Sequence, residues 1–189
     1  MKYFIALLFS FFVFSLYAQE KKAPIEQKSG VVFKELKIKF FADHVFKKVK
    51  GECIKPKVEN LKVIPDVNGV SAEVPFSISC TIVNMHTGDE NRDSHMWEIL
   101  GYPDQKEINF SVKNLELTKK GTYSFQGDLT IKGTTKPVSF TASSKQENGS
   151  LKINATFDIL LSDFKVERPS VVFTSIKDKV RIEWEAWLK

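Results

Sequence analysis

The sequence predicts an all-β protein in which an antiparallel sheet of about eight strands closes into a barrel. Apolar and polar residues alternate with period two in most segments after residue 30, as expected of strands that bury one face. The dipeptides Asn68-Gly69 and Asn148-Gly149 separate such segments, and Asn-Gly favours tight hairpin turns. About eight strands is the number at which an antiparallel sheet can close on itself.

The first half of the barrel is predicted from three segments. A first strand is expected between Val31 and Phe41, and "VKGECIKP" follows after a short connection. Gly51 in that segment indicates a bulge or the close approach of another backbone. A third segment has one apolar face, formed by Val74, Phe76, Ile78, Cys80 and Ile82.

A non-periodic, charged connection then precedes the later strands. Its residues 91–100 are predicted to form a short helix, with Asn91 or Asp93 as the N-cap and Gly101 just past the end. Met96, Ile99 and Leu100 would form the apolar side of this helix.

The second half of the chain alternates more regularly. Ile108 to Val112 keep one parity and Leu115 takes the other, which predicts a bulge or bend between them. The next hairpin is expected to turn at Gly133-Thr134-Thr135. The segments 151–159 and 180–186 close the barrel.

The N-terminus is typical of an exported protein. Residues 1–18 combine Lys2, an apolar run and Ala18, which predicts a signal peptide cleaved before Gln19. No cysteine follows the run, so lipoprotein acylation is not expected. Residues 19–30 are predicted to be a flexible polar lead, and residues 31–189 a single domain. The expected location is periplasmic or secreted.

Charge and cysteine content narrow the class of protein. Removing Lys2 with the signal leaves 27 basic and 23 acidic side chains, a net charge of +4. The lysines are dispersed and export removes the usual partner, so no nucleic-acid binding is expected. Cys53 and Cys80 each lie on an apolar strand face, and the sequence leaves open a disulfide or two buried free thiols.

The inward face of the predicted barrel is almost wholly apolar. From periodicity alone, two interpretations remain: these residues pack against each other, or they surround an apolar ligand. The lumen candidates are Phe40, Phe76, Ile78, Phe110, Tyr123, Phe125, Phe140, Phe157 and Trp184.

The connection also contains Arg92, Asp93 and His95. A structural role is favoured, in which Arg92 and Asp93 form ion pairs that hold the connection over the barrel and His95 satisfies backbone groups. A role at a cavity mouth is the alternative. His86 and His95 lack further ligands at zinc-site spacing, and no catalytic motif is present, so neither a metal site nor an enzyme is expected.

The chain resembles the YceI-like family of secreted, lipocalin-like β-barrels that bind polyisoprenoid lipids. The resemblance is carried by Thr87-Gly88, by Arg92-Asp93-x-His95, by Tyr102-Pro103 and by "FQGDLTIKGTTKPV" from Phe125 to Val138. It implies an up-and-down barrel with one or two short helical insertions, whose apolar lumen holds a lipid.

This resemblance leads to the functional hypothesis. The protein is expected to sequester or carry a polyisoprenoid or similar long-chain lipid, for example an isoprenoid quinone, without covalent change and without a cofactor. The alternative is an envelope or surface interaction protein with a solid, ligand-free barrel. Contact with a membrane surface and homodimerisation are left open.

Overall fold

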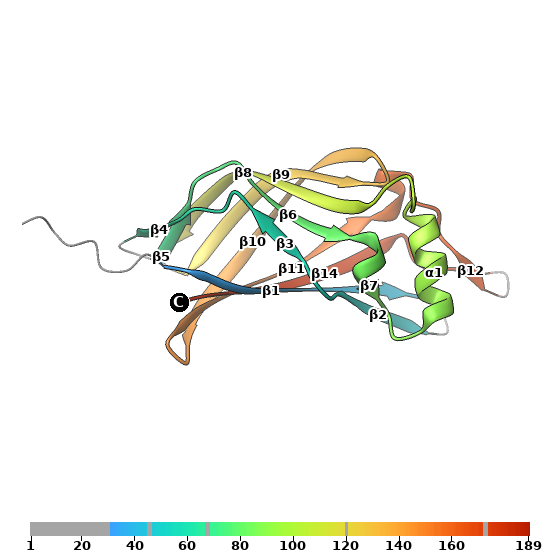
Figure 1. Ribbon diagram of the computed structural model, residues 1–189, viewed down its shortest axis with the longest axis horizontal. Coiled ribbons are helices and arrows are strands. Elements are labelled where there is room, and N and C mark those ends of the chain that lie inside the picture. The colour runs from blue at the N-terminus through green and yellow to red at the C-terminus, as the bar shows by residue number, and fades with distance from the viewer. Residues whose placement is uncertain (1–30, 45–46, 67–68, 120, 172–173) are drawn as a thin grey trace, which may run out of the picture.

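The computed structural model describes residues 31–44, 47–66, 69–119, 121–171 and 174–189. A ten-stranded antiparallel sheet curls around the core, and its order is β3-β6-β8-β9-β10-β11-β14-β1-β2-β7 (Figure 1). Its strands are β1 (Phe33–Asp43), β2 (Lys48–Cys53), β3 (Lys57–Glu59), β6 (Phe76–Thr81), β7 (Met85–His86), β8 (Glu107–Lys119), β9 (Thr122–Ile131), β10 (Thr134–Glu147), β11 (Ser150–Leu160) and β14 (Lys179–Leu188).

The remaining elements lie at the two ends of the molecule. The helix α1 (Glu90–Ile99) stands at one end of the long axis, and the hairpin of β4 (Val63–Asp66) and β5 (Gly69–Ala72) lies at the other (Figure 1). Two 3-10 helices, η1 (Ile82–Asn84) and η2 (Leu161–Phe164), follow β6 and β11. The short pair β12 (Ser170–Val171) and β13 (Thr174–Ser175) forms a separate two-stranded sheet.

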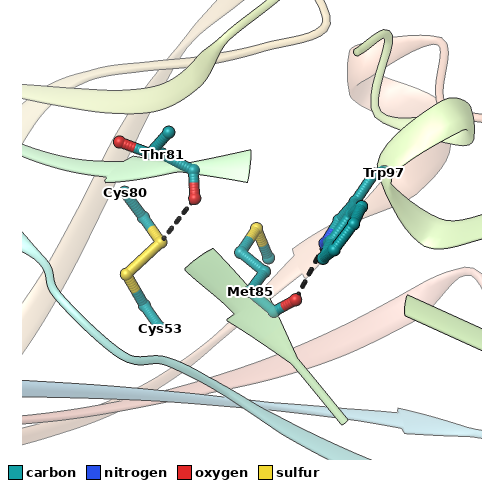
Figure 2. The surroundings of a disulfide bond; sticks show 5 residues. All are labelled: Cys53, Cys80, Thr81, Met85 and Trp97. Atoms are coloured by element: carbon teal, nitrogen blue, oxygen red, sulfur yellow. Dashed lines mark hydrogen bonds between the residues drawn. A yellow bond between two sulfur atoms is a disulfide. The ribbon is translucent and has the colours of Figure 1, made fainter. Parts of the chain in front are cut away.

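The sheet has a seam, because its edge strands β3 and β7 do not pair with each other. The chain crosses this seam twice, from β2 to β3 and from β6 through η1 to β7, which pairs with β2. A disulfide between Cys53 of β2 and Cys80 of β6 spans the same seam (Figure 2). The predicted all-β barrel class is confirmed, and the strands outnumber the predicted eight because short segments flank the seam.

Hairpin turns follow the local sequence. Asn148 and Gly149 take φ angles of 51° and 74° between β10 and β11, as predicted for a tight turn. Between β9 and β10 the turn is Lys132-Gly133, with φ of 49° and 70°. The predicted position at Gly133-Thr134-Thr135 was therefore wrong, since Thr134 already pairs with Ile131. In the β4–β5 hairpin Asp66 pairs with Gly69, and residues 67–68 lie outside the described residues.

Two predicted irregularities are present. The register between β8 and β9 shifts between Val112 and Asn114, where the apolar parity changes. Gly51 lies opposite Phe40, and a Cβ at Gly51 would be 2.1 Å from Phe40 Cζ and 2.8 Å from the carbonyl oxygen of His86. The close approach of the His86 carbonyl confirms the predicted approach of another backbone, and the Phe40 ring also occupies the space that a side chain at position 51 would need.

Other predictions need correction or lie outside the described residues. The N-cap of α1 is Asp89, not Asn91 or Asp93, because the Asp89 side chain accepts from the Arg92 N–H at 3.0 Å. Val74 is 43% exposed although a buried face was predicted, since it lies in the connection between β5 and β6 and not in a strand. The predicted signal peptide and polar lead, residues 1–30, lie outside the described residues. Among the described helices, none combines the length and apolar character needed to cross a membrane.

Candidate functional site

The barrel contains a cavity of about 270 Å³, close to the lower end of the roughly 300–1,000 Å³ usual for small-molecule sites. It occupies the half of the barrel next to α1, and neither β4 nor β5 contributes to its wall. The strands contribute Leu36, Ile38, Phe40, Ala42, Val49, Cys53, Ile78, Ser79, Cys80, Met85, Ile108, Phe110, Leu129, Ile131, Val138, Phe140, Phe157, Ile159, Val180, Ile182 and Trp184. Helices and loops contribute Thr87, Arg92, His95, Met96, Ile99, Leu100, Leu161, Val166, Glu167, Pro169 and Ile176.

Six of the nine lumen candidates line this cavity, namely Phe40, Ile78, Phe110, Phe140, Phe157 and Trp184. The other three, Phe76, Tyr123 and Phe125, do not reach it and are at most 4% exposed. Period-two alternation predicts the inward face of a strand but not the height of each residue along the barrel. One part of the inward face therefore packs against itself, and the other part lines a cavity.

The two halves are separated by stacked aromatic rings. Phe140 is stacked on Phe157 with ring centroids 4.2 Å apart and on Phe125 at 5.2 Å. Trp184 meets Phe125 and Phe140 edge-on at 5.4 and 6.1 Å, and Phe110 lies 5.6 Å from Phe140. Such contacts favour one defined packing of the rings. They form an aromatic layer, defined here as Phe110, Phe125, Phe140, Phe157 and Trp184.

Beyond this layer, inward side chains of β8 and β9 are buried. Val112 is fully buried and Tyr123 is 1% exposed. The Tyr123 hydroxyl accepts a hydrogen bond of 3.1 Å from the Val70 N–H of β5. A Cβ at Gly69 would lie 2.5 Å from the same hydroxyl oxygen, so the β4–β5 hairpin packs directly onto Tyr123. The lumen is consequently blocked at the end opposite α1.

Polar residues gather at the α1 end of the cavity. Arg92 donates from Nε to Thr87 Oγ1 at 2.8 Å and from Nη2 to the Thr87 carbonyl oxygen at 3.0 Å. His95 also lines this end, where its side chain is 60% exposed and lies 3.8 Å from Glu98. The exposed Glu167 lines the cavity as well, which identifies this end as its mouth.

Asp93 lies at the N-terminal end of α1 and contacts residues that precede the helix. It is 3% exposed and accepts hydrogen bonds from the N–H of Thr87, at 2.8 Å, and from the Thr87 hydroxyl. Its second oxygen lies 3.3 Å from His86 Nδ1. Asp93 therefore holds the segment before α1 through His86 and Thr87.

Arg92 and His95 each lie near a carboxylate of the same segment. The carboxylate nearest Arg92 is Asp89, at 3.8 Å. The backbone hydrogen bond from Arg92 lowers the pKa of Asp89 below its ordinary value, and the Arg92 charge acts in the same direction. His95 lies on the exposed side of α1. It was predicted to satisfy backbone groups, whereas its side chain lies 3.8 Å from the Glu98 carboxylate.

The cysteines contribute to the cavity wall as well as to the seam. The alternatives left open by the sequence are resolved in favour of a disulfide, and both residues line the cavity. Beside it, Trp97 of α1 donates from Nε1 to the Met85 carbonyl oxygen of β7 at 2.9 Å (Figure 2). This bond ties the helix to β7, one of the two edge strands at the seam.

Sequence reasoning missed several wall residues in irregular segments. Met85, Val166, Pro169 and Ile176 line the cavity but lie in two-residue strands or loops. No periodicity marks such positions, because only an extended strand or a helix imposes one.

An antiparallel barrel with an apolar cavity and a polar mouth is the architecture of the lipocalin-like class. Within the described residues, no group of three or more His, Cys, Asp or Glu side chains is arranged to hold a metal ion. The YceI-like domain model matches residues 27–187, and the chain belongs to this family.

Individual relatives agree with this assignment. A UPF0312 protein of Pseudomonas putida strain F1 is 28% identical over 119 residues, which are 57% of this chain and 60% of the relative's length. Burkholderia cenocepacia BcnA superposes with a TM-score of 0.66 at 15% identity, covering 80% of this chain and 95% of BcnA. A Saccharophagus degradans domain described as polyisoprenoid-binding gives 0.61 at 8% identity, covering 85% and 97%. At these identities the two structures establish the fold alone.

Proposed function

We propose that this protein is an exported carrier that holds a polyisoprenoid or similar long-chain lipid, such as an isoprenoid quinone, in the cavity between α1 and the aromatic layer. The observation that carries the proposal is the cavity itself, whose wall is apolar everywhere except near the mouth and the seam. Membership of the YceI-like family and the polyisoprenoid-binding description of the Saccharophagus domain support the same ligand class. Export is supported by the signal-peptide pattern of residues 1–18.

Apolar burial is sufficient to drive such binding. One five-carbon isoprene unit contributes roughly 3 to 4 kcal/mol gross, at about 0.8 kcal/mol per methylene. Association costs about 4 to 15 kcal/mol, so a few buried units offset it without any charged contact. Arg92 and His95 are placed to contact a polar head group at the mouth, where Thr87 orients the Arg92 guanidinium. No covalent change of the lipid is needed for this role.

The alternative of an interaction protein with a solid, ligand-free barrel has less support. The part of the barrel next to α1 is hollow, and Ile78, Phe157 and Ile182 are only partly buried although they point inward. A solid barrel would bury such side chains fully.

The test is to extract the purified protein, residues 19–189, with organic solvent and to identify the retained lipid by mass spectrometry. Replacing Ile159, a cavity residue, with Trp should fill the space near the mouth and remove the lipid. The matched control is Leu160→Trp, because Leu160 is the next residue on β11 and is 40% exposed. The proposal is contradicted if the native protein is empty and stays empty after incubation with quinones and prenols.

A further inference from the structure

The aromatic layer bounds the cavity on β8, β10, β11 and β14, whereas on β1 the wall continues to Leu36, which pairs with Ala186. On β8, β10, β11 and β14 the wall of the cavity ends with one member of the layer, which is Phe110, Phe140, Phe157 or Trp184. The next inward residues along these strands, Val112, Ala142, Ala155 and Ala186, are buried and do not reach the cavity. On β9 the wall ends at Leu129, and Phe125 lies behind Phe140.

We infer that this layer is the floor of the lipid site and sets the length of hydrocarbon chain that the protein can enclose. The inference rests on the proposed function and adds a specificity determinant to it. A chain that enters beside α1 meets the stacked rings, and behind them Tyr123 and the β4–β5 hairpin leave no exit. The protein therefore differs from an open tunnel, which would accept chains of any length.

The strand geometry gives the depth of the site. Val180, near the mouth, and Trp184, in the floor, are four residues apart on β14. At about 3.3 Å per residue they lie roughly 13 Å apart along the strand, which gives a depth of roughly 10 to 13 Å because barrel strands tilt relative to the axis. An extended isoprene unit has four main-chain carbon–carbon bonds of about 1.5 Å and spans roughly 5 Å. The floor thus admits about two or three isoprene units, and the rest of a longer lipid stays at or outside the mouth.

Phe140 is the central residue of the floor. Its ring contacts four aromatic rings, those of Phe110, Phe125, Phe157 and Trp184. Replacing Phe140 with Ala opens space toward Phe125 and lowers the floor. Replacing Ile182 with Phe has the opposite effect, because Ile182 lines the cavity one inward position closer to the mouth than Trp184.

The experiment measures the affinity of prenyl alcohols of increasing length, from geraniol upward, by displacement of an apolar fluorescent dye. For the native protein, each added isoprene unit that fits inside the cavity should improve the affinity by about tenfold or more. Each added unit that stays outside should improve it by less than about threefold. The chain length at which the gain in affinity falls, called the break, is expected at about two or three isoprene units in the native protein. It should come one unit later in Phe140→Ala and one unit earlier in Ile182→Phe.

Phe76→Ala is the matched control, because Phe76 is a buried aromatic residue that does not line the cavity, and its break should stay with that of the native protein. Circular dichroism verifies folding, and Ile182→Phe keeps the test decisive if Phe140→Ala does not fold. The inference is overturned if the affinity rises with chain length without a break. It is also overturned if the folded Phe140→Ala and Ile182→Phe proteins show the same break as the native protein. In both cases the carrier function stands. A native protein that binds none of the alcohols instead contradicts the proposed function.

Discussion

The buried carboxylate of Asp93 shows how one residue organises the cavity mouth. Its two oxygens engage Thr87 and His86, which precede the helix, although Asp93 itself lies in the first turn of α1. Thr87 in turn accepts from Arg92, so one carboxylate indirectly orients the cation that lines the cavity. A carboxylate near a helix N-terminus also interacts favourably with the helix dipole.

Asp93→Ala should therefore destabilise the protein by about 2 to 4 kcal/mol, because the N–H and hydroxyl of Thr87 lose their acceptor in a partly buried site. Urea unfolding at neutral pH measures the change in free energy. Glu90→Ala is the control, since Glu90 lies in the same helical turn and is exposed. Equal stability of both variants would mean that Asp93 does not anchor the connection.

At the level of elements, side-chain hydrogen bonds fix the short helices that line the cavity mouth. The 3-10 helix η2 places Leu161 in the cavity wall and is fixed to the start of β14 by Asp178. The Asp178 carboxylate accepts from the Ser162 N–H at 2.9 Å and from the Ser162 hydroxyl at 2.6 Å. These bonds, with the hydroxyl bond contributing most, lower the pKa of Asp178 below its ordinary value of 3.8.

This lowered pKa predicts a pH dependence of stability. Because the folded pKa lies below the unfolded one, the contribution of Asp178 is fully present above pH 3.8 and is lost as pH falls through the folded pKa. The stability difference between the native protein and Asp178→Asn should thus be constant near neutral pH and shrink in acid. Urea unfolding across this pH range measures the stability difference. Asp163→Asn is the control, because Asp163 lies in η2 next to Ser162. A difference that does not change with pH would contradict the assignment.

At the level of the whole molecule, closure of the barrel depends on the seam. β7 pairs with β2 through only Met85 and His86, and the bond from Trp97 holds β7 to α1 (Figure 2). The disulfide joins β2 to β6, two strands that come from opposite ends of the sheet order. It therefore supplies a covalent closure where the hydrogen-bond ladder is interrupted.

Replacing both cysteines with Ala should lower the free energy of unfolding by roughly 3 to 4 kcal/mol, since the bridge spans 27 residues and restricts the unfolded chain. Urea unfolding of the native and double-Ala proteins gives this difference. Adding reductant to the native protein should reproduce most of it, and should leave the double-Ala protein unchanged. A loss below about 1 kcal/mol would show that pairing and packing alone close the seam.

Local features were predictable because they depend on neighbours in the chain. Side chains alternate across an extended strand, so the inward faces and the parity change after Val112 could be predicted. Asn148-Gly149 adopts the positive φ angles that its turn requires, and Gly51 marks a close approach. The family resemblance added the barrel and its ligand class.

Features that join distant segments required the folded chain. Phe125 and Phe140 share the same inward parity and pair directly between β9 and β10, yet only Phe140 reaches the cavity. Which of these two stacked rings faces the open space depends on how the side chains of all the strands pack. Cys53 and Cys80 likewise meet only when β2 and β6 come together at the seam. The partners of Asp93 are set in the same way, because β7 pairs with β2 there and Thr87 follows β7. Alternation determines which face of a strand is apolar, whereas the division of that face into a solid core and a cavity depends on how all the strands pack together.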